Sequence, residues 1–289
     1  MGQLRSVQQI SPPPAAIHPA EHPASAPLLW VEAISKSLGT GTQITKIIGS
    51  VSFGAQRGEF VSVVGPSGCG KTTLLMCLAG LYTVDSGRLT FNGKAVSSPP
   101  EGVSVVFQDY SRSLLPWKSN FDNVLFGMKR ITDMDPAAKR ALAGDLMASV
   151  GLKGFESSYP WQLSGGMQQR VAIARGLAAR SRLLLLDEPL AAVDAQTRAE
   201  MQDLLLDLAK KYDQTCVLVT HDVDEAVYMA DRIVVLSKRP TTVVADLPVS
   251  LPKPRDQLQT REDPAYLGLR HKVITLIRSM RAGAATQES

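Results

Sequence analysis

Long apolar runs are absent from this sequence of 289 residues. The densest run, Leu183-Leu184-Leu185-Leu186, is far shorter than the roughly 20 apolar residues that a membrane-spanning helix requires. The N-terminus also has no basic segment followed by an apolar one, which a secretory signal would need. We therefore predict a cytosolic chain that does not cross a membrane by itself.

Cysteine is scarce as well, and its positions share no pattern. Cys69, Cys77 and Cys216 are an odd number of widely separated residues. Such a set provides neither the paired spacing of a disulfide framework nor the clustered spacing of a zinc site. The sequence therefore indicates neither disulfide staples nor bound zinc.

Charge of one sign is not concentrated in the body of the chain. The formal net charge is +4, and residues 232–289 carry ten basic against five acidic residues, so the excess lies in this tail. The tail could face anionic lipid or an acidic partner, or it could be an ordinary solvated surface. The body has no basic stripe, which argues against nucleic acid as a partner.

Composition divides the chain into three parts. Residues 1–28 are rich in Pro and Ala and are predicted to be a disordered leader. Residues 29–240 are predicted to form an α/β domain, with a helical insertion at about 111–165. Residues 241–289 are predicted to be a Pro-rich basic extension, irregular up to Pro264, with a helix from about 265 to 281.

Apolar runs predict buried parallel strands in the α/β domain, because such strands are covered on both faces. Helical patterns alternate with several of these runs, as expected of a parallel sheet. The predicted strands are Phe60–Val64, Val103–Phe107, Leu183–Asp187, Cys216–Thr220 and Ile233–Ser237, and the helices Gln168–Ala179, Thr197–Lys211 and Asp224–Ala230.

One eight-residue segment has the pattern G-x-x-x-x-G-K-[ST] between a predicted strand and a predicted helix. Its glycines let successive N–H groups point at a phosphate, Lys71 supplies a charge for the outer phosphates, and Thr72 offers a hydroxyl to Mg²⁺. A simple glycine turn is the alternative. The predicted ATP-binding residues of this segment and its neighbour are Gly65, Pro66, Ser67, Gly68, Cys69, Gly70, Lys71, Thr72 and Thr73.

Two carboxylates, Asp187 and Glu188, follow the apolar strand at 183–186. Open α/β sheets bind ligands at such strand ends. Asp187 is placed to hold Mg²⁺ and Glu188 to accept a proton from an attacking water. An acidic turn without function is the alternative.

A second helix start and a lone histidine complete the set of motifs. Ser164 is a natural N-cap, and Gly165 and Gly166 allow close approach of an anion to the helix N-terminus, although the same letters can be a simple cap. His221 follows the predicted strand Cys216–Thr220 and could, on its own, be an ordinary polar residue at a strand end.

Together these motifs resemble the ATPase subunit of an ATP-binding cassette (ABC) transporter over roughly residues 29–240. The resemblance implies an α/β P-loop NTPase core with an antiparallel β subdomain and an inserted helical subdomain. It also implies a homodimer that sandwiches ATP and Mg²⁺ between two copies. Ser164 and Gly166 of one copy would then contact the γ-phosphate held by Lys71 of the other.

The same resemblance assigns three further roles. Gln108 would touch Mg²⁺ and the attacking water, His221 would contact the γ-phosphate, and Asp194 would link the two sites across the interface. With Glu188 as the base, these are the predicted catalytic and interface residues. Leu38 stands where the family usually has the aromatic residue that stacks on adenine, so the adenine contact is open, with Trp30 as one substitute.

A finer resemblance is to the nitrate/sulfonate/taurine importer branch, through Leu114-Leu115-Pro116-Trp117, the segment Asp224–Arg232 and Asp263-Pro264-Ala265-Tyr266-Leu267. It implies a peripheral subunit on the cytoplasmic face of the inner membrane. Two integral-membrane permeases fed by a periplasmic or surface solute-binding protein would be its partners. The residues expected at the permease are Tyr110, Leu114, Leu115 and Trp117, which could instead only pack within the insertion.

Other functions remain as alternatives. A soluble cassette ATPase of DNA repair or the ribosome usually has long coiled coils or two cassettes, which this sequence lacks. A regulatory subunit that binds nucleotide without turnover would not need Lys71, Asp187, Glu188 and His221 together. A P-loop kinase would not need the Ser164-Gly165-Gly166 cap.

Overall fold

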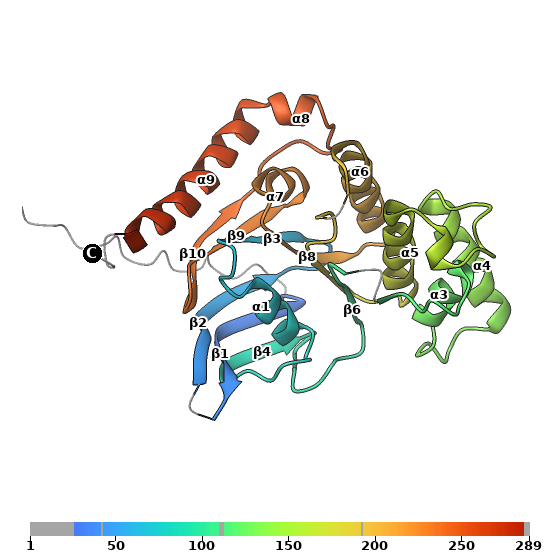
Figure 1. Ribbon diagram of the computed structural model, residues 1–289, viewed down its shortest axis with the longest axis horizontal. Helices are drawn as coiled ribbons and strands as arrows, with labels where there is room; N and C mark the ends of the chain where they lie inside the picture. The colour runs from blue at the N-terminus through green and yellow to red at the C-terminus, as the bar shows by residue number, and fades with distance from the viewer. Residues whose placement is uncertain (1–25, 42, 110–112, 192, 286–289) are drawn as a thin grey trace, which may run out of the picture.

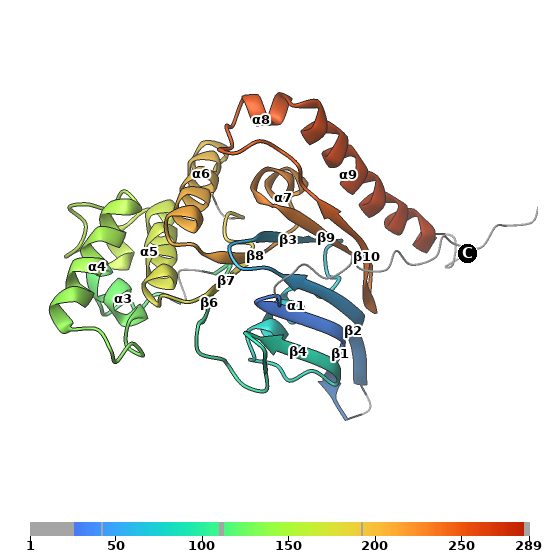
Figure 2. The same cartoon turned by 180° about the vertical axis from the view of Figure 1, so that it is seen from behind.

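The computed structural model describes residues 26–41, 43–109, 113–191 and 193–285. Ten strands form one sheet in the order β5-β4-β1-β2-β10-β9-β3-β8-β7-β6 (Figures 1 and 2). The strands divide into a parallel half and an antiparallel half, which β10 joins. Among the described residues, no helix combines the length and the apolar character that a membrane span would need.

The parallel half contains the predicted buried strands. The hydrogen-bonded neighbours are β9 (Arg232–Leu236), β3 (Phe60–Val64), β8 (Thr215–Thr220), β7 (Leu183–Asp187) and β6 (Val103–Val106). Every residue of β3, β7 and β8 is buried. These apolar runs therefore form strands that are covered on both faces, as predicted from the sequence.

The antiparallel half consists of β1 (Leu29–Thr40), β2 (Gln43–Ala55), β4 (Ser86–Phe91) and β5 (Lys94–Ala95). Among the described strands, β1 and β2 are the longest, with 12 and 13 residues. The prediction of an irregular chain from Pro240 to Pro264 is wrong in part. Thr241–Pro248 form β10, which pairs in parallel with β2 and antiparallel with β9.

Helices α3 (Asn120–Gly127), α4 (Pro136–Ser149) and α5 (Gly165–Ala178) pack together at one end of the molecule (Figure 1). The 3₁₀ turn η1 (Pro160–Gln162) precedes α5. The Asp135 carboxylate caps α4 by accepting bonds from the N–H groups of Ala137 and Ala138, at 3.0 and 3.1 Å. Helices α3 and α4 lie in the region where the sequence predicts a helical insertion, and the insertion as a separate subdomain stays a prediction.

The remaining helices are α1 (Lys71–Leu78), α6 (Ala195–Lys211), α7 (Val223–Met229), α8 (Gln259–Glu262) and α9 (Pro264–Ala285). Helix α9 packs along α7 and reaches the edge of β9 (Figure 2). Val273 of α9 is fully buried in this contact, and Tyr266 nearly so. The C-terminal part of the chain is therefore docked on the α/β core.

Candidate functional site

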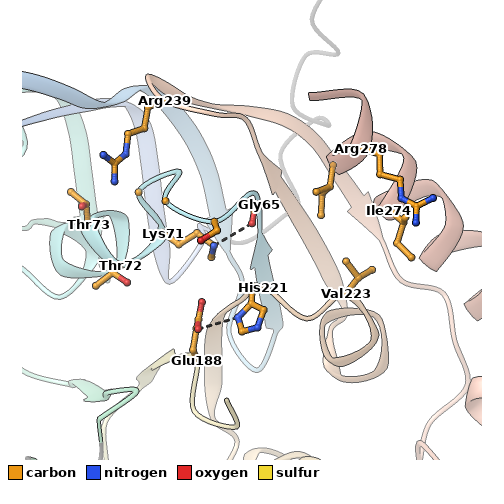
Figure 3. Close-up of a pocket in the computed structure, with 14 residues that line it drawn as sticks. Gly65, Lys71, Thr72, Thr73, Glu188, His221, Val223, Arg239, Ile274 and Arg278 are labelled. Carbon is orange, nitrogen blue, oxygen red and sulfur yellow. Dashed lines mark hydrogen bonds and ion pairs between the residues drawn. The ribbon is translucent and has the colours of Figure 1, made fainter. Parts of the chain in front are cut away.

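A cavity of about 540 Å³ opens at the carboxyl edge of the parallel strands (Figure 3). This is the edge at which α/β sheets bind ligands. The cavity contains most of the predicted phosphate loop together with two of the predicted catalytic residues. Its lining residues are Gly65, Ser67, Gly68, Gly70, Lys71, Thr72, Thr73, Glu188, His221, Val223, Arg239, Ile274, Ile277 and Arg278.

The loop between β3 and α1 has the backbone that a phosphate cradle requires. Gly68 and Gly70 have φ values of +72° and +108°, which glycine adopts without strain. The Lys71 side chain is buried and folds back, and its ammonium donates to the carbonyl oxygens of Gly65 and Pro66 at 3.2 and 3.3 Å. An ammonium has three N–H donors, so one stays available for an anion.

Helix α1 differs from its neighbours at its N-terminus. It begins after Gly70 with no side-chain cap. Helices α3 to α7 are each capped by the side chain of a Ser or Asp. The first N–H groups of α1 therefore face the cavity without a side-chain partner, which is the arrangement that binds phosphate.

Asp187 and Thr72 offer oxygen donors beside the loop. The Thr72 hydroxyl donates to Asp187 Oδ1 at 3.4 Å, and Asp187 is only 4% exposed. Burial raises the pKa of Asp187, with the hydrogen bond from Thr72 acting in the opposite direction. A cation would offset that penalty, and hard oxygen donors are the ligands Mg²⁺ prefers. The two residues therefore fit a magnesium site.

Glu188 is the meeting point of the predicted catalytic residues. Its Oε2 lies 3.0 Å from His221 Nδ1 (Figure 3). The same oxygen accepts a bond from Gln108 Nε2 at 3.3 Å. Its Oε1 has no hydrogen-bond partner among the described residues. Glu188 has a φ of +44°, a strained conformation for a residue with a side chain. The Glu188 carboxylate lines the cavity with Oε2 held by two neighbours and Oε1 available to a ligand.

The second predicted anion site lies elsewhere. Ser164 caps α5 by accepting a long 3.4 Å bond from Met167, and Asp194 caps α6 by accepting bonds from the N–H and hydroxyl of Thr197. Neither Ser164, Gly165 and Gly166 nor Asp194 lines the cavity of the same chain. Within one chain, these residues and the phosphate loop are therefore separate.

Comparison with known proteins assigns the family. Residues 48–191 match the family model described as ABC transporter. The chain is 42% identical over 250 residues to the ABC transporter ATP-binding protein MJ0412 of Methanocaldococcus jannaschii, covering 86% of this chain and 91% of that protein. It is 40% identical to the aliphatic sulfonates import ATP-binding protein SsuB of Bacillus licheniformis, covering 85% and 92%.

The chain belongs to the ATP-binding proteins of ABC transporters. It is also 42% identical to the nitrate import ATP-binding protein NrtC of Synechococcus elongatus, over 80% of this chain but only 35% of that longer protein. A solved dimeric structure of MJ0796, an ABC transporter cassette, matches with a TM-score of 0.68 at 30% identity, covering 76% of this chain and 98% of that one. A second dimeric structure of that cassette, in a post-hydrolysis state with ADP and Pi, gives a TM-score of 0.67.

These matches confirm the predicted ABC-ATPase fold and the predicted activity, the hydrolysis of ATP. The roles of single residues stay predictions, although Lys71, Thr72, Glu188 and His221 line one cavity and Asp187 and Gln108 contact its walls. Pro66 and Cys69 belong to the loop but do not line the cavity.

The residues predicted to contact a permease are placed differently from one another. Trp117 is 71% exposed and Leu115 partly exposed, so both stay candidates. Leu114 is only 2% exposed and packs in the core, so for this residue the structure favours the packing alternative over a permease contact. Tyr110 lies outside the described residues.

Several lining residues were not predicted from the sequence. Arg239 follows β9, and Ile274, Ile277 and Arg278 come from α9. The strand-end rule that identified Asp187 and His221 applies equally to Arg239 and could have found it. The α9 residues carry no such signal, because only the docking of α9 on α7 brings them to the cavity.

Proposed function

We propose that this chain hydrolyses ATP with Mg²⁺ to energise an importer of a small solute of the nitrate, sulfonate or taurine type. The observation that carries the proposal is the convergence of Lys71, Glu188 and His221 on one cavity beside an uncapped helix. The solute class comes from relatives that are named as sulfonate and nitrate import proteins.

The reaction we infer is attack of water on the γ-phosphorus. As the new P–O bond forms, the bond to the bridging oxygen of the β-phosphate breaks, giving ADP and inorganic phosphate. The free Oε1 of Glu188 would accept the proton of the attacking water, while Gln108 and His221 fix the other oxygen. The N–H groups of α1 and the Lys71 ammonium would hold the β- and γ-phosphates.

Magnesium would be held by Thr72 and Asp187, with Gln108 nearby. The described residues include no group of three or more His, Cys, Asp or Glu that could hold a metal ion by themselves. That fits Mg²⁺, which uses one or two protein oxygens and completes its coordination with phosphates and water. When bound, the ion supplies positive charge that offsets the charge developing on the phosphate oxygens.

We further propose that two copies complete each ATP site. Ser164, Gly165 and Gly166 begin a helix and are accessible, yet they do not line the cavity of their own chain. A second copy in head-to-tail orientation would present this helix N-terminus to the γ-phosphate, and Asp194 would lie at the same interface. Two solved structures of the cassette MJ0796, which has this fold, are dimeric and support the arrangement.

Membrane partners complete the proposal. Two permeases would hold the dimer at the cytoplasmic face of the inner membrane, and a periplasmic or surface binding protein would deliver the solute. Trp117 is an exposed aromatic within the predicted helical insertion, where a permease segment could bury it. Nothing in the chain indicates nucleic acid as a partner.

Replacement of the proposed base tests the reaction. We expect Glu188→Gln to lower steady-state ATP hydrolysis by about 10²-fold or more, because an amide cannot accept the proton, while ATP binding is kept. Turnover by phosphate release and affinity by calorimetry are the measurements. The control is Glu262→Gln, which changes an exposed carboxylate on α8. Turnover near the wild-type rate in Glu188→Gln would exclude Glu188 as the base.

A further inference from the structure

Five parallel strands end at the cavity edge, and four of them have an assigned role. The phosphate loop follows β3, Asp187 and Glu188 end β7, His221 follows β8, and Gln108 follows β6. The fifth strand, β9, runs parallel to β3 and is followed by Arg239, which lines the cavity. Arg239 therefore has the same topological position as the other site residues, without an assigned role.

Strand order gives the direction in which the nucleotide lies. The order β9-β3-β8-β7-β6 puts His221, Glu188 and Gln108 on one side of the phosphate loop. These residues act on the γ-phosphate in the proposed function, on which this inference rests. The nucleoside, at the opposite end of the phosphate chain, must then extend across β3 toward β9. Arg239 follows β9, and Figure 3 shows it near Thr73, at the opposite end of the cavity from Ile274 and Arg278 of α9.

The backbone that carries Arg239 is held firmly against the phosphate loop. The Thr241 hydroxyl, two residues further on, donates to the carbonyl oxygen of Cys69 inside the loop. On the β9 side the packing is so close that a Cβ at Gly65 would lie 3.1 Å from Leu236 Cβ. The backbone at Arg239 therefore has a fixed position beside the phosphate loop.

The side chain of Arg239 is exposed, and its guanidinium has no hydrogen-bond or ion-pair partner among the described residues. A guanidinium is planar, weakly hydrated and able to stack on an aromatic ring while keeping its charge. It is therefore available for a ligand at the mouth of the cavity.

The adenine ring of ATP needs such a contact, because no Phe, Tyr or Trp is among the residues that line the cavity in the described part of the chain. Leu38, at the position expected for the stacking aromatic, packs against the apolar cluster of β1 and β2. The ring of Trp30 covers Gly54 on β2, where a Cβ would lie 3.0 Å from it. Neither side chain reaches the cavity.

We propose that Arg239 is the adenine-binding residue of this chain and stacks its guanidinium on the purine ring. The contact is a cation–π and stacking contact in place of an aromatic–aromatic one. If this contact forms, the affinity for ATP depends on the planar shape of the guanidinium and not on its charge alone.

Binding of two ligands by the full-length protein tests this proposal. We would measure the affinities of ATP and of inorganic tripolyphosphate, which lacks a base, by calorimetry. Arg239→Ala should lower the affinity for ATP about tenfold and leave the affinity for tripolyphosphate unchanged. Arg239→Lys keeps the positive charge but loses the planar guanidinium, so it should lower the affinity for ATP by a similar factor. Lys238→Ala, which removes the same charge one residue away and outside the cavity lining, should change neither affinity.

Each other outcome overturns the proposal. Equal weakening of ATP and tripolyphosphate by Arg239→Ala would mean that Arg239 binds phosphate. Unchanged ATP affinity in Arg239→Ala, with a loss in Ile277→Ala, would put the base against α9. Lys71→Ala distinguishes a failure of the proposed function from a failure of the Arg239 proposal. If Lys71→Ala leaves the affinities for ATP and tripolyphosphate intact, the proposed phosphate site itself is wrong, whatever Arg239 does.

Discussion

At the scale of single residues, the fold buries carboxyl side chains at a cost in free energy. Asp187 is one, and Glu225 on α7 is another: it is 3% exposed, and its Oε1 has no hydrogen-bond partner in the described structure. Burial raises the pKa of Glu225 to about 7; Asp222 acts in the same direction, while Thr220, Arg198 and His221 act against it. A carboxyl of this kind carries a proton at mildly acidic pH and loses it near neutrality.

Stability should therefore depend on pH through Glu225. Its folded pKa lies above the unfolded value of 4.5, so the stability it contributes falls as pH rises from about 4.5 to 7. Glu225→Gln mimics the protonated form, so we expect little gain at pH 5 and a gain of up to about 3 kcal/mol at pH 8. Urea unfolding at both pH values measures this, with the exposed Glu101→Gln as control. A gain of the same size at both pH values would mean that the buried charge of Glu225 does not destabilise the fold.

At the scale of elements, α9 connects the C-terminal part of the chain to the site. Arg270 forms an ion pair with Asp224 at 2.6 Å, and the Tyr266 hydroxyl bonds to the same carboxylate at 3.0 Å. Both ion-pair side chains are about 40% exposed, at 42% and 38%, whereas Val273 is fully buried. Apolar burial, more than the ion pair, should therefore hold α9 against α7.

Two substitutions on α9 separate these contributions. Val273→Ala should lower the free energy of unfolding by about 2 kcal/mol, because it leaves a small cavity in the core. Arg270→Ala should lower the free energy of unfolding by at most about 1 kcal/mol, because the ion pair is largely solvated. The effect of Arg270→Ala should become smaller in 1 M salt, which screens the ion pair. Denaturant unfolding with and without salt provides both values. The opposite ranking would mean that the ion pair dominates.

The element scale also shows how far the sequence could predict this site. The phosphate loop, Asp187-Glu188 and the Asp135 cap are local patterns whose chemistry is contained in adjacent residues. The role of β10 was missed because Pro240 and Pro248 frame it and suggest a loop, although burial alternates along much of the strand. Leu114 was ambiguous because the same side chain can pack inside or bind a partner. The contribution of α9 could not be predicted, because it depends on docking between distant segments.

At the scale of the whole molecule, the proposed phosphate cavity and the N-terminus of α5 are separate within one chain of the described structure. Gly165 is the first residue of α5 and is exposed. A carboxylate at this position should not harm the single chain, because acidic side chains in the first turn interact favourably with the helix dipole. In the proposed dimer the same carboxylate would face the γ-phosphate of the other copy and repel it. One substitution thus distinguishes a site made by one chain from a site made by two.

We therefore expect Gly165→Glu, added to Glu188→Gln, to prevent dimer formation with Mg-ATP while ATP still binds to the single chain. With Mg-ATP present, light scattering should give a mass near twice 31.1 kDa for Glu188→Gln alone and a mass of 31.1 kDa for the double variant. The matched control is Gly144→Glu on α4, where an added Cβ meets nothing within 4 Å, and it should leave the dimer intact. A dimer that persisted in the Gly165→Glu background would remove α5 from the interface. A Glu188→Gln protein that stayed a single chain in saturating Mg-ATP would reject the two-copy site altogether.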